Sequence, residues 1–170
     1  MQWCFNRSLL VLNFHETIVY NGLKRINKAE KSLSEIVLKT ALLLEEACHE
    51  SKLEESYRVY IRDYAKYSHY VKLISRDEYG PIKAQIQSAS AIASDPDTYF
   101  IEPIQRICRY PLLLQRVLKE AQKINFDQVD KIEKAFEVVK RSTESINALQ
   151  STADRRVEAR EESIIRKTSK

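Results

Sequence analysis

The chain has very few of the residues that favour turns. Its 170 residues include only two glycines and four prolines. A sheet protein reverses direction many times and places Gly or Pro in many of those reversals, so this sparse supply favours a small number of long helices. A chain of this length is about the size of one domain and buries roughly 70% of its unfolded surface. We therefore expect an all-α domain with one core.

The charge and the reactive side chains disfavour several function classes. A net charge of +4 is too small to indicate nucleic-acid binding, and we expect none. The three cysteines are scattered, which is typical of reduced thiols in the cytosol, so we expect a cytoplasmic protein. Neither the cysteines nor the histidines have metal-ligand spacing, and no nucleophile–base pair is evident. We expect no metal, no cofactor and no covalent chemistry.

Apolar residues recur at helical spacing along most of the sequence. The spacing predicts helices over residues 5–25, 32–50, 53–74, 103–120 and 129–149, with a weaker segment at 82–94. In the first helix we expect one stripe of Leu9, Leu12, Ile18 and Leu23, widened by Val11, Phe14 and Val19. The third helix carries tyrosines three and four residues apart from Tyr57 to Tyr67. Such a stripe is usually core, and a cofactor site is the less favoured reading.

The segment "EPIQRICRYPLLLQRVLKEA", residues 102–121, has helical periodicity although it carries Pro103 and Pro111. Pro103 fits the first turn of a helix, where its missing N–H has no partner to lose. Pro111 falls in the interior, where proline removes a backbone hydrogen bond and clashes with the carbonyl four residues earlier, at a cost of about 3 kcal/mol. We therefore expect a bend at Pro111.

Two faces of this proline-containing helix differ in character. The apolar residues form a seam that we expect to be buried: Ile104, Ile107, Pro111, Leu114 and Leu118. The opposite face carries an outer row that consists of Gln105, Arg109, Leu112 and Arg116. This outer row either shields apolar neighbours with long basic side chains or binds a partner through a leucine among polar donors.

The string "FIEPIQRICRYPLLLQRVL" closely resembles the third signature segment of the Dbl-homology domain, the catalytic domain of Rho-family guanine-nucleotide exchange factors. Residues 103–107 and 109–114 match the family pattern without a gap. Weaker similarity extends to "LNFHETIVYNGL" (12–23), to "YRVYIRDYAKY" (57–67) and to the pair Ile146-Asn147 in the last helix. Together these matches cover about residues 5–150.

The resemblance implies an elongated Dbl-homology-type helical bundle that binds a Rho-family small GTPase. Such domains promote GDP release by remodelling the switch regions of the GTPase. By resemblance, Gln105 and Arg109 would contact switch 2, with Asn147 reaching the same region from the last helix. Cys108 would touch the region that distinguishes one GTPase from another. With the rest of the outer row, the GTPase-binding set is Gln105, Cys108, Arg109, Leu112, Arg116 and Asn147.

The sequence also departs from the family pattern. We expect residues 1–150 to form the Dbl-homology domain without its first signature helix, whose glutamate engages switch 1. Residues 151–170 would be a helical tail, either solvated or a basic patch for a membrane surface. The family predicts a pleckstrin-homology domain downstream, through which a longer protein would associate peripherally with a membrane. The alternative function is a non-catalytic helical interaction module that binds a GTPase or another partner without exchange activity.

Overall fold

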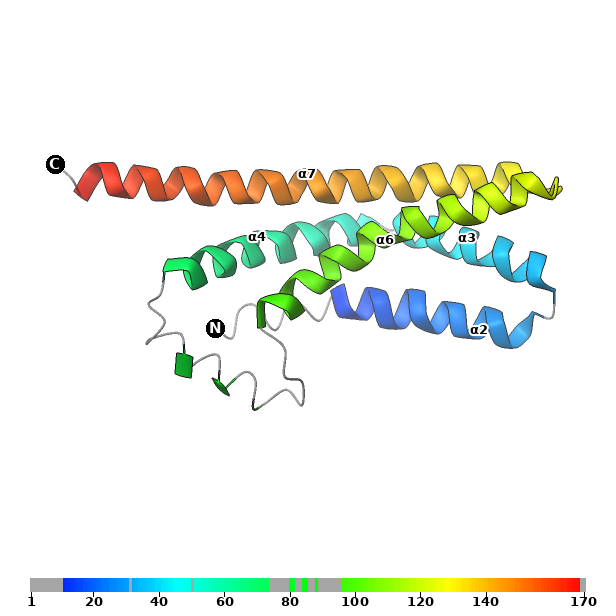
Figure 1. Cartoon of the computed structure of the whole chain (residues 1–170), viewed down its shortest axis with the longest axis horizontal. Coiled ribbons are helices and arrows are strands. Elements are labelled where there is room, and N and C mark those ends of the chain that lie inside the picture. The colour runs from blue at the N-terminus through cyan, green and yellow to red at the C-terminus, as the bar shows by residue number, and fades with distance from the viewer. Residues whose placement is uncertain are drawn as a thin grey trace.

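The computed structural model describes residues 11–30, 32–49, 51–73 and 96–168, together with 80–81, 84–85 and 88. Every regular element within these ranges is helical, which confirms the all-α prediction (Figure 1). The elements are the π-helix η1 (Phe14–Tyr20) and the α-helices α2 (Asn21–Ala29), α3 (Leu33–His49), α4 (Ser51–Leu73), α6 (Pro96–Lys123) and α7 (Val129–Thr168). The predicted weak segment at 82–94 lies largely outside the described residues.

Helix α7 is the element against which α3, α4 and α6 all pack. It has 40 residues, so it is about 60 Å long at 1.5 Å per residue. Helices α3 and α4 follow each other along α7, and α6 crosses beside them (Figure 1). The η1–α2 segment packs against α3 on the side away from α7 (Figure 1). The helix continues through the predicted domain boundary at residue 150, and that boundary stays a prediction.

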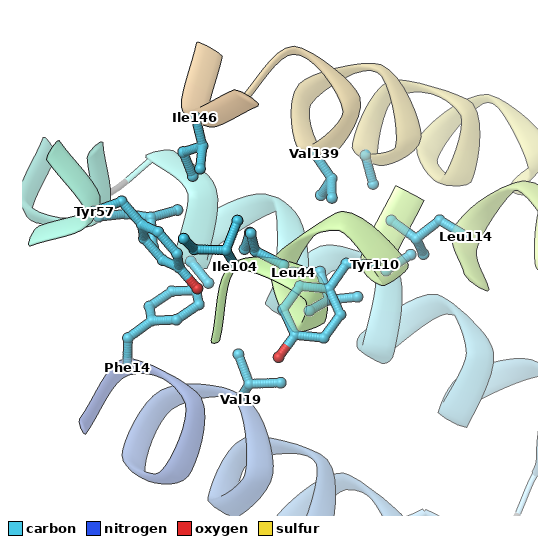
Figure 2. Packing of buried hydrophobic residues seen from close by; sticks show 14 of the residues in the cluster. Phe14, Val19, Leu44, Tyr57, Ile104, Tyr110, Leu114, Val139 and Ile146 are labelled. Carbon is cyan, nitrogen blue, oxygen red and sulfur yellow. The ribbon is translucent and has the colours of Figure 1, made fainter. Parts of the chain in front are cut away.

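One continuous hydrophobic core joins these helices. Most of the predicted seam of α6 is buried, with Ile104 and Leu114 each 2% exposed and Ile107 fully buried, whereas Pro111 is only partly buried. The first part of the tyrosine stripe of α4 is core, as expected, since Tyr57 and Tyr60 are buried, whereas Tyr64 and Tyr67 are partly buried. The α7 contribution to the same cluster is Ile132, Ala135, Val139 and Ile146 (Figure 2). Of the described helices, none combines the length and the apolar composition that crossing a membrane requires.

The first helical segment differs from the expected stripe. Residues Val11, Phe14 and Val19 are buried, whereas Leu12 is half exposed. The cause is the π-helical stretch, in which the N–H of Asn21 bonds to the carbonyl of Glu16, five residues earlier. A π-helix turns less per residue than an α-helix, so the residues that share a face are shifted. The prediction is therefore wrong for Leu12, whereas Ile18 and Leu23 are partly buried and Leu9 lies outside the described residues.

Helix α6 begins seven residues before Pro103, so the prediction that Pro103 lies in the first turn is wrong. The earlier start is at Pro96, a residue that suits a helix N-terminus because its missing N–H costs nothing there. Two tyrosines of α4 bond to carbonyls beside Pro103: Tyr60 donates to Phe100, and Tyr57 donates to Pro103 itself at 3.0 Å. These bonds join α4 to the part of α6 that carries Pro103. The helix continues through Pro111, and the bend there stays a prediction.

A tight turn connects α6 to α7. The N–H of Phe126 bonds to the carbonyl of Ala121 at 3.0 Å, and the N–H of Asn125 bonds to the carbonyl of Gln122 at 3.2 Å. This pair of bonds is a Schellman motif, which needs a left-handed residue after the helix. Asn125 supplies it with φ of 50°, a conformation that asparagine adopts more readily than most residues. The turn folds α7 back along α6 and so sets the two helices side by side.

Candidate functional site

The outer row of α6 is open to solvent. Gln105, Arg109, Leu112 and Arg116 are all exposed, as the helical wheel predicted. Leu112 is 58% exposed. On α7, Asn147 is also exposed. The structure thus leaves five of the six residues of the predicted binding set available to a partner.

A side-chain bond connects the two helices at this surface. The thiol of Cys108 donates to Oδ1 of Asn147 at 3.2 Å. Cys108 directly precedes Arg109 in α6, so Asn147 borders the outer row although it lies 38 residues further along the chain. The fold therefore brings Asn147 against Cys108, at the border of the outer row, which sequence periodicity within one helix could not establish.

Cys108 is placed differently from the other five residues. It is half-buried and packs against the core rather than projecting into solvent. Burial raises the pKa of the Cys108 thiol. The group therefore stays a protonated thiol at neutral pH and keeps a proton to donate. Its geometry is that of a support beneath the surface.

The charge of the surface is uncompensated. Within the described part of the chain, neither Arg109 nor Arg116 forms an ion pair with a carboxylate, whereas Arg106 lies 3.5 Å from Glu102. Leu113, which sequence reasoning left out of the binding set, is 54% exposed beside Leu112. Two exposed leucines beside unpaired guanidinium groups could serve as an apolar contact for a partner protein. Leu112 and Leu113 are each more than half exposed, so neighbouring side chains shield them only in part.

A buried hydrogen-bond chain holds α6 from the opposite flank. Tyr57 donates its hydroxyl proton to the carbonyl of Pro103, so its oxygen accepts the Nε2–H of His15 at 2.6 Å. Nδ1 of His15 is then the acceptor for the hydroxyl of Tyr110 at 2.7 Å. Both tyrosine hydroxyls point toward η1 in the core (Figure 2). These hydrogen bonds thus fix the position of α6 relative to η1 and α4, and therefore the direction in which the outer row faces.

The members of this chain are uncharged at neutral pH. Burial, with a smaller contribution from the Arg106 charge, lowers the pKa of His15 from 6.5 to about 4. Burial raises the pKa of Tyr110 to about 12 and that of Tyr57 further still. An imidazole and two phenols without charge are inexpensive to bury when each polar atom is bonded. This arrangement is structural support and was not foreseen from the sequence.

Other reactive groups in the described residues do not gather into a chemical site. Burial raises the pKa of Cys48 to about 11, so its thiol is a poor nucleophile. Glu45 is buried but engaged by Lys134 at 3.2 Å and by His49 at 3.7 Å. Across the described ranges, no group of three or more His, Cys, Asp or Glu could hold a metal ion. The exposed surface of α6 and α7 is suited to recognition.

Comparison with known proteins supports the all-α architecture and the family resemblance of the signature segment in α6. The family model of the RhoGEF domain matches residues 1–147. A RhoGEF domain-containing protein of Dictyostelium discoideum, gxcJ, is 36% identical over 63 residues, which cover 34% of this chain and 6% of that protein. The chain therefore spans only a small part of this relative. No solved structure gives a significant match. Because the family model covers most of its length, this chain belongs to the RhoGEF (Dbl-homology) domain family.

Proposed function

We propose that this domain binds a Rho-family small GTPase through α6 and α7 and promotes release of GDP by remodelling the switch regions. The observation that carries the proposal is the exposed, unpaired row of α6 with Asn147 beside it, in a member of the RhoGEF family. Such an activity involves no covalent step. It requires that the surface bind the nucleotide-free GTPase more tightly than the GDP-bound form.

The chemistry of the surface fits this task. Arg109 and Arg116 offer charged donors in fixed planar geometry, which suit carboxylates and backbone carbonyls of a flexible loop. Asn147 and Gln105 add neutral amides, and Leu112 adds an apolar contact. A loop that is bound in a displaced conformation loses its contacts with the nucleotide and its magnesium ion. Binding energy at this surface would thus be converted into faster nucleotide release.

The test is release of fluorescent GDP from a panel of Rho-family GTPases, with binding to each nucleotide-free GTPase measured in parallel. Arg109→Ala and Asn147→Ala should each weaken binding by about 1–3 kcal/mol, the range for truncating an important interface contact. Because both residues are exposed, we expect the free energy of unfolding to change by no more than about 0.5 kcal/mol.

Arg141→Ala is the matched control on α7. Arg141 is exposed, and it lies six residues, or about 1.7 turns, before Asn147, so it points to another side of the helix. It should leave both binding and exchange unchanged. If Arg109→Ala and Asn147→Ala exchange as fast as the parent, the site assignment fails. Binding of the GTPase without any acceleration of GDP release would instead identify a non-catalytic interaction module.

A further inference from the structure

We propose that Cys108 is a positioning residue for Asn147: its thiol fixes the Asn147 amide with Oδ1 turned inward and the NH₂ group presented to the partner. The inference deepens the proposed function and rests on it where it concerns the GTPase. It assigns Cys108 a role beneath the binding surface, in place of the direct contact that the sequence resemblance implied.

The geometry of the bond supports this role. The 3.2 Å contact joins side chains that are 39 residues apart and that come from two different helices. Cys108 is anchored because it packs against the core. An exposed asparagine without a bonded partner samples several rotamers, and ordering it costs conformational entropy on binding. The bond removes part of that cost before the partner arrives.

The bond also determines which end of the amide the partner meets. A thiol is a weak donor, and the oxygen of an amide accepts, so Sγ–H pairs with Oδ1. The neighbouring Ser151 bonds to the backbone carbonyl of Asn147 at 3.2 Å and uses neither end of the amide. Two N–H donors therefore remain for the partner. The complementary group on the GTPase is an acceptor, either a carbonyl or a carboxylate.

The first experiment measures the orientation without any GTPase. The side-chain amide signal of Asn147, assigned by its disappearance in Asn147→Ala, is followed by ¹⁵N relaxation. In the parent chain we expect an ordered amide. Cys108→Ala should make it mobile, and Cys108→Ser should keep it ordered because a hydroxyl also donates. An amide that is equally mobile in parent and Cys108→Ala would overturn the proposal.

The second experiment is a double-mutant cycle in GDP release. Cys108→Ala should slow release about 3- to 10-fold, and Cys108→Ser should restore it to within about twofold. In the Asn147→Ala background, Cys108→Ala should cause no further loss, because the residue through which it acts is gone. A loss of the same size in both backgrounds would mean that Cys108 touches the GTPase directly, and it would refute the positioning role.

The two experiments separate this inference from the proposed function. If the parent chain binds no Rho-family GTPase, the proposed function fails, while the relaxation comparison still decides whether Cys108 holds Asn147. If the parent exchanges nucleotide and Asn147→Ala does not, but Cys108→Ala behaves as the parent, only the positioning role fails. Thermal unfolding of each variant is the control for global destabilisation.

Discussion

Nδ1 of His15 accepts the hydroxyl proton of Tyr110 at 2.7 Å, joining residues that are 95 positions apart. Tyr110 lies in α6, within the signature segment, and His15 lies in η1. The opposite ring nitrogen of His15 bonds to Tyr57 of α4. A neutral, ε-protonated imidazole is therefore the connection between three helices. This connection lies on the flank of α6 away from Asn147, so it supports the binding surface without entering it.

The first prediction follows from the low pKa of His15. The folded-state pKa is about 4 and the ordinary value is 6.5, so between these pH values the unfolded chain binds a proton that the folded chain does not. Stability is therefore complete above pH 6.5 and falls as the pH decreases toward 4, by roughly 3 kcal/mol in total. Urea unfolding at several pH values between 7.5 and 5 should show about 2 kcal/mol of this loss, because the folded-state pKa lies below that range.

His15→Gln is the comparison for the pH experiment. A glutamine can replace both ring nitrogens as hydrogen-bonding groups but does not titrate. The variant should be less stable at pH 7.5, and its stability should depend less on pH between 6.5 and 5, where few groups other than histidines change charge. His49 and His69 remain in both proteins. Equal pH dependence in the two proteins would show that His15 is not buried as a neutral group.

The second prediction ranks the stability cost of removing the hydroxyl from each of the two tyrosines that bond to His15. Tyr110→Phe removes one bond and leaves Nδ1 of His15 buried without a donor, which should cost about 1–3 kcal/mol. Tyr57→Phe removes two bonds, those to His15 and to the Pro103 carbonyl, and should cost more. Chemical denaturation of both variants measures the difference. If Tyr57→Phe were the milder change, the proton arrangement inferred for the chain would be wrong.

The sequence predicted those features that depend on one helix at a time. Ile104, Ile107 and Leu114 fell on a buried seam because the helical repeat alone determines a face. The position of Pro103 seven residues into α6 was not predicted, and its contacts with Tyr57 and Tyr60 of α4 are long-range. The π-helix was missed because it has no clear signal in residue type.

The candidate site shows the same division between local and long-range information. Gln105 and Arg109 were identifiable as neighbours because they are four residues apart in one helix. The approach of Asn147 to Cys108 depends on how α7 folds back along α6, which is a property of the packed bundle. The partners of His15 likewise come from two other helices. Only the three-dimensional structure could establish these contacts.

The third prediction concerns the close approach of α2 to α3 at Gly22. A Cβ added at Gly22 would lie 2.6 Å and 2.8 Å from the two methyl carbons of Leu43. Alanine in place of a helical glycine usually stabilises by about 1 kcal/mol, but overpacking costs about 1–3 kcal/mol. We expect Gly22→Ala to be destabilising, since Cγ of Leu43 is also within 3.3 Å and the whole side chain must move.

A second substitution tests the origin of that cost. In a Leu43→Ala background the obstructing methyl groups are gone, and Gly22→Ala should become stabilising by about 1 kcal/mol. The four proteins of this cycle are compared by thermal and chemical unfolding. A penalty for Gly22→Ala that is the same with and without Leu43 would mean that Leu43 is not its cause.

The last prediction separates the two faces of α6 with a matched pair of substitutions. Ile107 is fully buried, so Ile107→Ala should create a cavity and cost about 2–5 kcal/mol of stability. Leu112 is 58% exposed on the outer row of the same helix, so Leu112→Ala should change stability by about 0.5 kcal/mol or less.

For binding of a nucleotide-free GTPase, measured well below the melting temperature, the order of the two effects should reverse. Leu112→Ala should weaken it by about 1–2 kcal/mol, whereas Ile107→Ala, where still folded, should bind nearly as the parent does. Equal binding by Leu112→Ala and the parent would remove the outer row of α6 from the proposed interface.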